Sequence, residues 1–405
     1  MPVAERRPTP CPLPKGGKPR RWHKVVAAVT VTLALLVGIV YLRAFLTLDS
    51  STASRALIWV DADVEDYKRF PARRIDAPVD TYVYDEGPGY PSGLPADVDL
   101  PDGHADLESF LDSTETTAFI VVRDDQLIYE RYFSGSDHDS TQTSFSVAKS
   151  FASALVGLAI DDGLIGLDDP ITDHIPELKE RDQRFESITI RHLISMSSGL
   201  RYEEQGNPWS DDTETYYNPD LRKLALTDTE IIGRPGESWH YNNFNPLLMG
   251  MILERATSMS VAEFMEERLW QPLGAEADAT WSLDSEKSGF EKMESGINGR
   301  AIDFAKLGSL YLHEGRWNGM RILPVSWVRE STAMGTEHDP SPGYGYWWWT
   351  FRDDGLGDYY AARGNKGQYI VVVPRRDAVI VRHGKDFGDV ENWVDTIADI
   401  ARSLP

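Results

Sequence analysis

A serine and a lysine three residues apart carry the clearest chemical signal in the sequence. Ser146 and Lys149 open an apolar run over 145–160, and no other lysine in the chain has a serine three positions before it. If that run is a helix, both side chains lie on one face of it. A serine in the first turn is also close to free backbone N–H groups and to the positive end of the helix dipole. A lysine amine accepts a proton only when it is neutral, which an apolar environment favours. The pair therefore predicts a serine nucleophile with a lysine base.

A second group must pass the proton on to the leaving group, and a tyrosine hydroxyl can do this. Two Tyr-x-Asn triplets are present, at 216–218 in an acidic loop and at 241–243 between a Gly-Arg-Pro-Gly turn and an apolar helical pattern. We expect Tyr241 to be the catalytic one, because a catalytic group needs rigid support. The alternative is a tyrosine that only packs beside Trp239 and His240.

A glycine-containing segment near the C-terminus provides the third element. Gly364, Asn365 and Gly367 precede a β-rich run over 369–374. Glycines in such a place allow a ligand to approach the backbone closely. An amide there would form one half of an oxyanion hole, and the N–H of Ser146 would form the other half. A plain β-turn is the alternative interpretation.

The elements that position these residues follow from periodicity and turn residues. Short helices are expected at 105–112 and 189–196, and a buried helix at 145–160. A β-hairpin is expected at 117–122 and 126–133. The segment 161–340 is mostly helical, with further helices at 246–257, 261–269 and 302–313. Strands return at 344–351, 369–374 and 378–383, followed by a last helix over 390–404. The pattern predicts an α+β fold in which both chain ends build one antiparallel sheet, flanked by helices, with a helical domain docked against it.

The charge of the chain is divided unevenly. The formal net charge is −23, but residues 1–44 carry +7 and the remainder carries −30. Residues 25–42 hold no charged side chain, and as a helix they span about 27 Å, enough for a bilayer. We therefore expect a basic cytoplasmic tail (1–24), a transmembrane anchor (25–42), a linker and covering arm (43–104) and an exported hydrolase domain (105–404), with a helical subdomain at about 161–340. Arg20, Arg21 and Lys24 keep the N-terminus cytoplasmic. The rival is a signal peptide cleaved near Ser51-Thr52-Ala53 and a secreted body.

Several other functions are excluded or disfavoured. The acidic balance argues against nucleic acid. The only cysteine, Cys11, lies in the tail, so the body has no disulfide or cysteine nucleophile. The nine histidines have no metal-ligand spacing, and neither a metal nor a cofactor is expected. His240 is expected to be packed, and Trp347–Trp349 to lie on a strand in the core with at least one able to face the cleft. The acidic run Asp211, Asp212 and Glu214 is read as solvated surface, although the loop 201–220 could border the cleft.

The three elements, in this order, resemble the serine β-lactamase-like superfamily, which includes class C β-lactamases, D-Ala-D-Ala carboxypeptidases, carboxylesterases and 6-aminohexanoate-dimer hydrolases. The resemblance covers about 105–404. Accessory stretches agree with it, namely 191–199, 271–274, 315–319 and 343–349. It implies a β-lactamase/transpeptidase-like fold, Ser146 as nucleophile, Lys149 and Tyr241 as proton handlers, and Asn243 as a substrate contact.

One departure from the superfamily narrows the expected function. Lactamases and carboxypeptidases usually carry Lys-Thr-Gly or His-Thr-Gly where this chain has Ala362-Arg363-Gly364, so the cation for a substrate carboxylate is missing, and Lys366 comes two residues after the triplet. The segment is more similar to the 6-aminohexanoate-dimer hydrolase and esterase branch, in which Asn365 would supply the second oxyanion N–H. We expect a serine hydrolase that cleaves a small amide or ester through an acyl-enzyme. The alternatives are a cell-wall D-Ala-D-Ala carboxypeptidase or β-lactamase, and a non-catalytic receptor or scaffold domain. The sequence leaves the substrate and the oligomeric state open.

Overall fold

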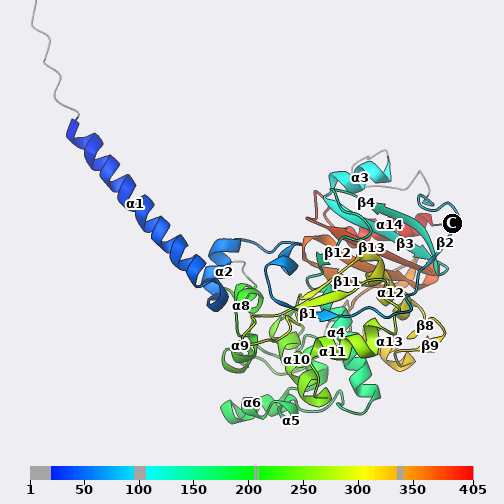
Figure 1. Ribbon diagram of the computed structural model, residues 1–405. Helices are drawn as coiled ribbons and strands as arrows, with labels where there is room; N and C mark the ends of the chain where they lie inside the picture. The colour runs from blue at the N-terminus through cyan, green and yellow to red at the C-terminus, as the bar shows by residue number, and fades with distance from the viewer. Residues whose placement is uncertain are drawn as a thin grey trace, which may run out of the picture.

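The main sheet of the molecule has seven strands from both ends of the chain (Figure 1). The computed structural model describes residues 20–94, 106–204, 207, 209–334, 341 and 343–404. The strand order is β10-β11-β12-β13-β3-β4-β2, and every neighbouring pair is antiparallel except β2 and β4. The strands are β2 (Asp85–Glu86), β3 (Thr116–Arg123), β4 (Gln126–Tyr132), β10 (Trp349–Asp353), β11 (Gly357–Gly364), β12 (Gln368–Val373) and β13 (Ala378–Gly384). The structure confirms a sheet built from both chain ends, whereas β11 and the parallel edge strand β2 are absent from the predicted strands.

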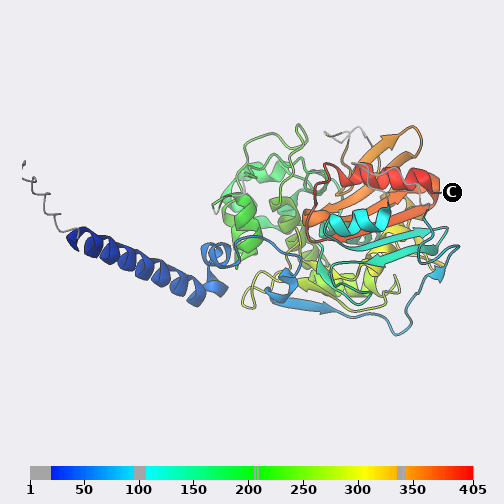
Figure 2. The ribbon, with the colours of Figure 1, turned by 90° about the horizontal axis from the view of Figure 1, so that it is seen from above.

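Helices cover both faces of this sheet, and the alternation of side chains along β3 explains why. Phe119 and Val121 belong to the core on one face, under α3 (Leu107–Ser113) and α14 (Trp393–Ser403). Ile120 and Val122 point to the other face and join the larger core, with α4 (Val147–Asp161) and α12 (Ala301–Leu312). Successive strand residues face opposite sides, so a strand apolar at every position is buried on both faces. Figure 2 shows α14 and α3 side by side over the first face.

Helix α4 lies at the centre of the molecule. Every residue from Val147 to Ala159 is buried, as the uninterrupted apolar sequence predicts. The helix follows the short strand β5 (Gln142–Thr143) and a sharp turn in which Phe145 has φ of 48°. This turn ends at Ser146, the residue immediately before the helix. The turn and the buried helix therefore fix the position of the serine.

The segment 161–340 is less uniformly helical than expected. Its helices are α5 (Ile171–His174), α6 (Pro176–Arg181), α7 (Ile190–Ile194), α8 (Asp211–Tyr217), α9 (Leu221–Thr227), α10 (Phe244–Thr257), α11 (Val261–Met265), α12 and α13 (Val325–Ser331). It also contains the strands β6 (Ala279–Ser282), β7 (Ile297–Gly299), β8 (Arg316–Trp317) and β9 (Met320–Arg321). Helix α12 packs on the main sheet, where Gly308 lets it approach Ile370 and Val379. The expected helical subdomain is thus mixed in structure.

The segment before residue 95 contributes a strand to each of the two larger sheets. Strand β1 (Ala72–Ile75) pairs with β6 in a second sheet of order β1-β6-β7-β5, and β2 extends the main sheet. Ahead of β1, α2 (Thr52–Trp59) packs against α8, where Thr52 Oγ1 donates a hydrogen bond to Glu214 at 2.9 Å. We call residues 51–75 the arm. The part of the predicted covering segment at 95–105 lies outside the described residues.

A long helix, α1 (Arg20–Leu46), stands away from the body (Figures 1 and 2). Within the described chain, Trp22–Leu46 is the one helix long and apolar enough to cross a membrane, and its apolar window is unburied. A signal sequence passes the same test. The basic residues of the predicted tail up to Lys18, and Cys11, lie outside the described residues.

The predicted strand over 344–351 is wrong in its first half. The strand β10 begins only at Trp349, because Trp347 has φ of 61° in a tight turn closed by hydrogen bonds between Gly345 and residues 347 and 348. Trp347 and Trp348 are fully buried in the core, as expected by default. The turn leaves Trp349 to line a cavity.

Candidate active site

Ser146 and Lys149 lie side by side at the start of α4. The Lys149 Nζ donates a hydrogen bond to the Ser146 Oγ at 3.0 Å and a second one to the backbone carbonyl of Glu294 at 2.9 Å. Lys149 is 1% exposed. One helical turn separates the two residues, so the geometry follows from their spacing. The arrangement holds an amine within proton-transfer distance of the hydroxyl.

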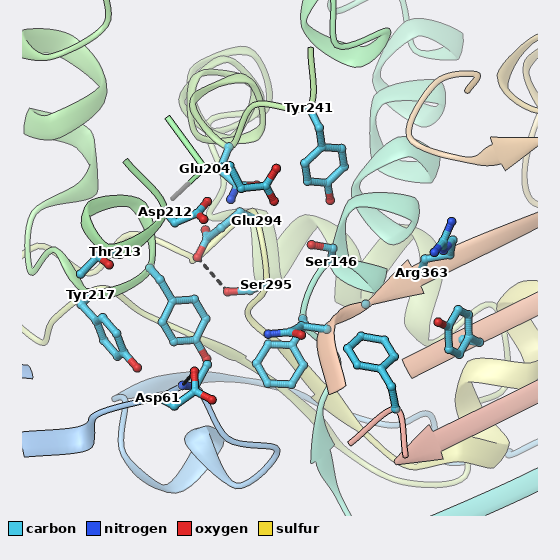
Figure 3. Close-up of a pocket in the computed structure, with 18 of the residues that line it drawn as sticks. Asp61, Ser146, Glu204, Asp212, Thr213, Tyr217, Tyr241, Glu294, Ser295 and Arg363 are labelled. Atoms are coloured by element: carbon cyan, nitrogen blue, oxygen red, sulfur yellow. Dashed lines mark hydrogen bonds between the residues drawn. The ribbon is translucent and has the colours of Figure 1, made fainter. Parts of the chain in front are cut away.

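Tyr241 completes this group from a neighbouring loop. The Lys149 Nζ lies 4.9 Å from the centre of its ring. In Figure 3 the phenolic oxygen of Tyr241 points toward Ser146. The ring stacks on Trp349 at 6.1 Å and meets Tyr344 edge-on. The loop itself is pinned by Asn242, whose side-chain amide donates to the carbonyl of Leu200 at 3.1 Å. Tyr241 therefore has the rigid support expected of a catalytic side chain.

The tyrosine of the other Tyr-x-Asn triplet, Tyr216, binds the arm rather than Ser146 or Lys149. The Tyr216 hydroxyl donates to Asp66 of the arm at 2.5 Å. Complete burial, with Asp66 close by, raises the pKa of Tyr216 well above its usual value. Its ring lines the same cavity as Ser146, but its hydroxyl is held by the arm.

The turn between β11 and β12 reaches the start of α4. Gly364 is the last residue of β11, and a Cβ there would lie 2.4 Å from the carbonyl oxygen of Ser144 and 3.3 Å from Val147. Only glycine permits this approach. Gly364 and Asn365 both line the cavity together with Ser146. The first N–H groups of a helix have no intrahelical acceptor. This places backbone amides from two elements at one site, as an oxyanion hole requires.

A cavity of about 500 Å³ opens over these residues, with acidic groups gathered on one side. Glu204, Asp212 and Glu294 lie together across the cavity from Arg363 (Figure 3). Burial raises the pKa of Asp212, and burial together with the charge of Asp212 raises that of Glu204. The acidic run that contains Asp212 is therefore not solvated surface. The alternative, a loop that borders the cleft, is correct, because α8 turns Asp212 inward against Tyr202.

Asn243, predicted as a substrate contact, lines the cavity. Its amide donates to the Tyr202 hydroxyl at 2.8 Å, whereas its buried side-chain oxygen has no hydrogen-bond partner within the described structure. One buried carboxylate oxygen of Glu294, Oε2, is equally unpaired. Buried polar atoms are normally satisfied. Both oxygens are covered by the surrounding protein, so a ligand donor reaches them only after a side-chain rotation.

Sequence reasoning missed several residues of this site. Glu294 and Ser295 precede β7 and carry no motif, and they reach the cavity because β7 pairs with β5 just before Ser146. No motif marks Arg363 as a site residue, yet its guanidinium lies 4.8 Å from the centre of the Trp349 ring. His240, in contrast, is exposed and lies edge-on to Tyr202, so its expected packing is wrong.

Neither residue 362 nor Lys366 supplies the cavity with a free cation. Ala362 is fully buried and offers the cavity no charge. The Lys366 Nζ forms an ion pair at 2.8 Å with Asp61 of the arm. Among the residues that the structure describes, no cluster of histidine, cysteine and carboxylate side chains could hold a metal ion.

Comparisons with known proteins agree with this fold. The profile of the β-lactamase family matches residues 105–401. The chain is 28% identical over 327 residues to the 6-aminohexanoate-dimer hydrolase of Paenarthrobacter ureafaciens, covering 74% of this chain and 81% of that protein. A provisionally named 6-aminohexanoate-dimer hydrolase of Bacillus anthracis superposes with a TM-score of 0.74 at 23% identity, over 88% of this chain and 97% of the other. A family VIII carboxylesterase superposes with a TM-score of 0.56 at 17% identity, over 73% and 95%. The chain thus belongs to the β-lactamase family and has the fold of its hydrolases.

Proposed function

We propose that this protein is a serine hydrolase that cleaves an amide or ester through an acyl-enzyme intermediate on Ser146. One observation supports this most strongly, namely the buried Lys149 amine that donates to the Ser146 hydroxyl at 3.0 Å while the Glu294 carbonyl fixes its position. A binding or scaffold domain has no need to bury an amine beside a serine, since burial of a cation is costly. The observation therefore favours catalysis over the receptor alternative.

Acylation follows from the positions of these groups. The Lys149 amine accepts the Ser146 proton as Oγ attacks the substrate carbonyl carbon. The oxyanion that forms is stabilised by the backbone N–H groups of Ser146 and Asn365. The proton then passes from Lys149 through the Tyr241 hydroxyl to the leaving amine or alkoxide, and the C–N or C–O bond breaks.

Deacylation repeats these steps with water. A water molecule loses a proton to the Lys149–Tyr241 pair as its oxygen attacks the acyl carbon. The Ser146–acyl bond then breaks, and the proton returns to Ser146 Oγ, which releases a carboxylic acid. The enzyme is restored without any metal or cofactor in these steps.

The charges of the cavity support a substrate with an amine rather than a free carboxylate near the scissile bond. The Glu294 carboxylate is already paired with the buried Lys292 ammonium at 2.9 Å, which leaves Glu204 and Asp212 as acidic groups that face the cavity. An ammonium group would pair with them, whereas a carboxylate would be repelled. The Paenarthrobacter relative is named for a dimer of an amino acid, 6-aminohexanoate, which carries an ammonium group at one end and a carboxylate at the other.

The same charges disfavour the carboxypeptidase and β-lactamase alternatives. Their substrates carry a carboxylate, and the residue aligned with its usual cation is the buried Ala362. Lys366 is paired with Asp61, and Arg363 lies over Trp349. Stable acylation by a fluorescent penicillin would nevertheless restore these alternatives.

We also propose that α1 is retained as a single-pass anchor, with the N-terminus cytoplasmic and the body exported, and that the membrane is its partner through this helix. Cleavage near Ala53 would cut inside α2, whose residues Thr52 and Ser54 are buried. Mass spectrometry of the N-terminus from the membrane fraction tests this. A mature chain that starts at Ser54 would contradict it.

Substitution of the nucleophile tests the main proposal. Ser146→Ala is expected to abolish both hydrolysis of a p-nitrophenyl ester and labelling by a fluorophosphonate. Ser153→Ala is the matched control, because Ser153 is buried on the same helix two turns further on and is absent from the cavity lining. Full activity and labelling of Ser146→Ala would refute the assignment.

A further inference from the structure

An exposed valine at the mouth of the cavity has an unusual backbone conformation. Val60 directly follows α2 and has φ of 63° and ψ of −61°. The Asp61 N–H donates to the Trp59 carbonyl at 2.7 Å, which closes a γ-turn of the rare, positive-φ kind around Val60. This conformation is strained for a β-branched residue. The Val60 side chain is nevertheless 79% exposed and lines the cavity.

The neighbours of Val60 hold it in this conformation from both sides. On one side, the Trp59 ring contacts Phe70 edge-on at 5.0 Å and Tyr217 at 5.8 Å. On the other side, Asp61 is paired with Lys366. Strain of this kind persists only where the surrounding structure determines it, and it clusters at ligand sites. The contacts of Trp59 and Asp61 therefore hold the Val60 side chain at the cavity.

A second exposed apolar side chain borders the same cavity. Phe387 follows β13, lines the cavity and is 37% exposed. Its backbone carbonyl accepts a hydrogen bond from the Trp393 indole N–H at 2.7 Å, which fixes the loop. Lys366 is paired with Asp61 of the arm, and a Cβ at the next residue, Gly367, would lie 3.1 Å from the backbone oxygen of Asp386, so the arm and this loop meet at this turn. We call Val60 and Phe387 the lip.

We infer that the lip binds an aliphatic chain of the substrate, and that the arm is therefore a specificity-determining part of the active site. The lip offers apolar surface, in contrast to the acidic wall of Glu204 and Asp212. Water leaves both lip side chains when a hydrocarbon chain covers them, which stabilises binding. The residues matched by the family profile begin at 105, so the arm contribution at 60 lies outside them. The substrate class is an amide or ester whose acyl or leaving group has a chain of several methylenes, and this part rests on the proposed function.

A chain-length series in the full-length protein tests this inference. The readout is the ratio of kcat/KM for p-nitrophenyl octanoate to that for p-nitrophenyl acetate. Val60→Gly removes the apolar contact and tolerates the positive φ, so the turn is retained. We expect the ratio to fall about three- to tenfold in Val60→Gly and also in Phe387→Ala, in line with the loss of one partly buried apolar side chain.

Val79→Gly is the matched control, because Val79 is a fully exposed valine that precedes β2 and does not line the cavity. Its ratio should equal that of the wild type. An unchanged ratio in both lip variants would overturn the inference.

A binding measurement separates this inference from the proposed catalysis. Octanamide is neutral, and its binding is followed by tryptophan fluorescence, since Trp349 lines the cavity. We expect Val60→Gly to weaken this binding about three- to tenfold. If the wild type hydrolyses no ester but the variant loses affinity, the lip stands and the proposed function fails. If esters are hydrolysed while octanamide fails to bind, or binds the variant equally well, the inference fails alone.

Discussion

A methyl group added at Gly364 should disable the oxyanion site without removing any catalytic side chain. A Cβ at this position would lie 2.4 Å from the carbonyl oxygen of Ser144, whereas such contacts are essentially never shorter than 3.0 Å. The turn must therefore move away from α4 by at least about 0.6 Å. The Gly364 backbone has φ of −128°, which alanine adopts freely, so the perturbation acts through steric contact, chiefly with Ser144 and less with Gln368 and Val147 at 3.1 and 3.3 Å.

The expected size of the effect follows from the geometry of oxyanion holes. Donors act at 2.7–3.1 Å from the oxyanion, and the loss of one donor typically lowers kcat by roughly 10²- to 10³-fold. Overpacking of this kind costs about 1–3 kcal/mol of stability. We therefore expect Gly364→Ala to lose at least about 100-fold in kcat for a p-nitrophenyl ester while it remains folded.

The assay combines steady-state kinetics with thermal unfolding. The control is Gly233→Ala, because a Cβ at Gly233 would meet its nearest neighbour at 3.7 Å, an ordinary contact, at a backbone that needs no positive φ. This variant should keep kcat. A folded Gly364→Ala protein with kcat within threefold of the wild type would refute the placement of the oxyanion hole at this turn.

Three further predictions test the base, the acidic wall and the core. Lys149→Met should lower kcat about 10²- to 10⁴-fold with little change in KM, because it removes the general base but keeps the volume of the side chain; steady-state kinetics would contradict the role if kcat were retained. Asp212→Asn should reduce, roughly tenfold, the preference for p-nitrophenyl 6-aminohexanoate over p-nitrophenyl hexanoate, measured as a ratio of kcat/KM, and an unchanged ratio would remove the ammonium site. Burial, aided by Arg382, lowers the pKa of His383 from 6.5 to about 3. The unfolded chain therefore binds this proton first, and the stability that neutral His383 contributes is complete above pH 6.5 and is lost as the pH falls toward 3. Urea unfolding at pH 7 and pH 5 should show that the wild type loses about 2 kcal/mol more than His383→Leu, and equal losses would contradict the burial argument.

The parts of the fold that the sequence predicts well depend on local periodicity. The apolar runs of α4 and of strands β3, β12 and β13 are each determined by their own residues, and they give the centre of the main sheet and the position of Ser146. The spacing of Ser146 and Lys149 gives their contact directly, because both lie on one turn of a helix.

The parts that it does not predict depend on distant contacts. Glu294 reaches the site through the pairing of β5 with β7, which no local pattern encodes. The inward direction of Asp212 depends on Tyr202, and the presence of Val60 in the cavity depends on ion pairing of the arm with Lys366. The turn at Trp347 is also not predicted by local sequence. Three consecutive tryptophans favour a strand, and the turn is set by hydrogen bonds around Gly345. A single sequence carries no readable signal for contacts between residues so far apart in the chain.

The most direct test of the central claim is the detection of the acyl-enzyme itself. Full-length protein is mixed with excess p-nitrophenyl ester, quenched in acid within the first turnovers and digested for mass spectrometry. We expect the peptide that contains Ser146 to gain the mass of the acyl group, and the same peptide from Ser146→Ala to remain unmodified. Ester hydrolysis by the wild type with an acyl group on another residue, or an acylated Ser146→Ala protein, would contradict the account.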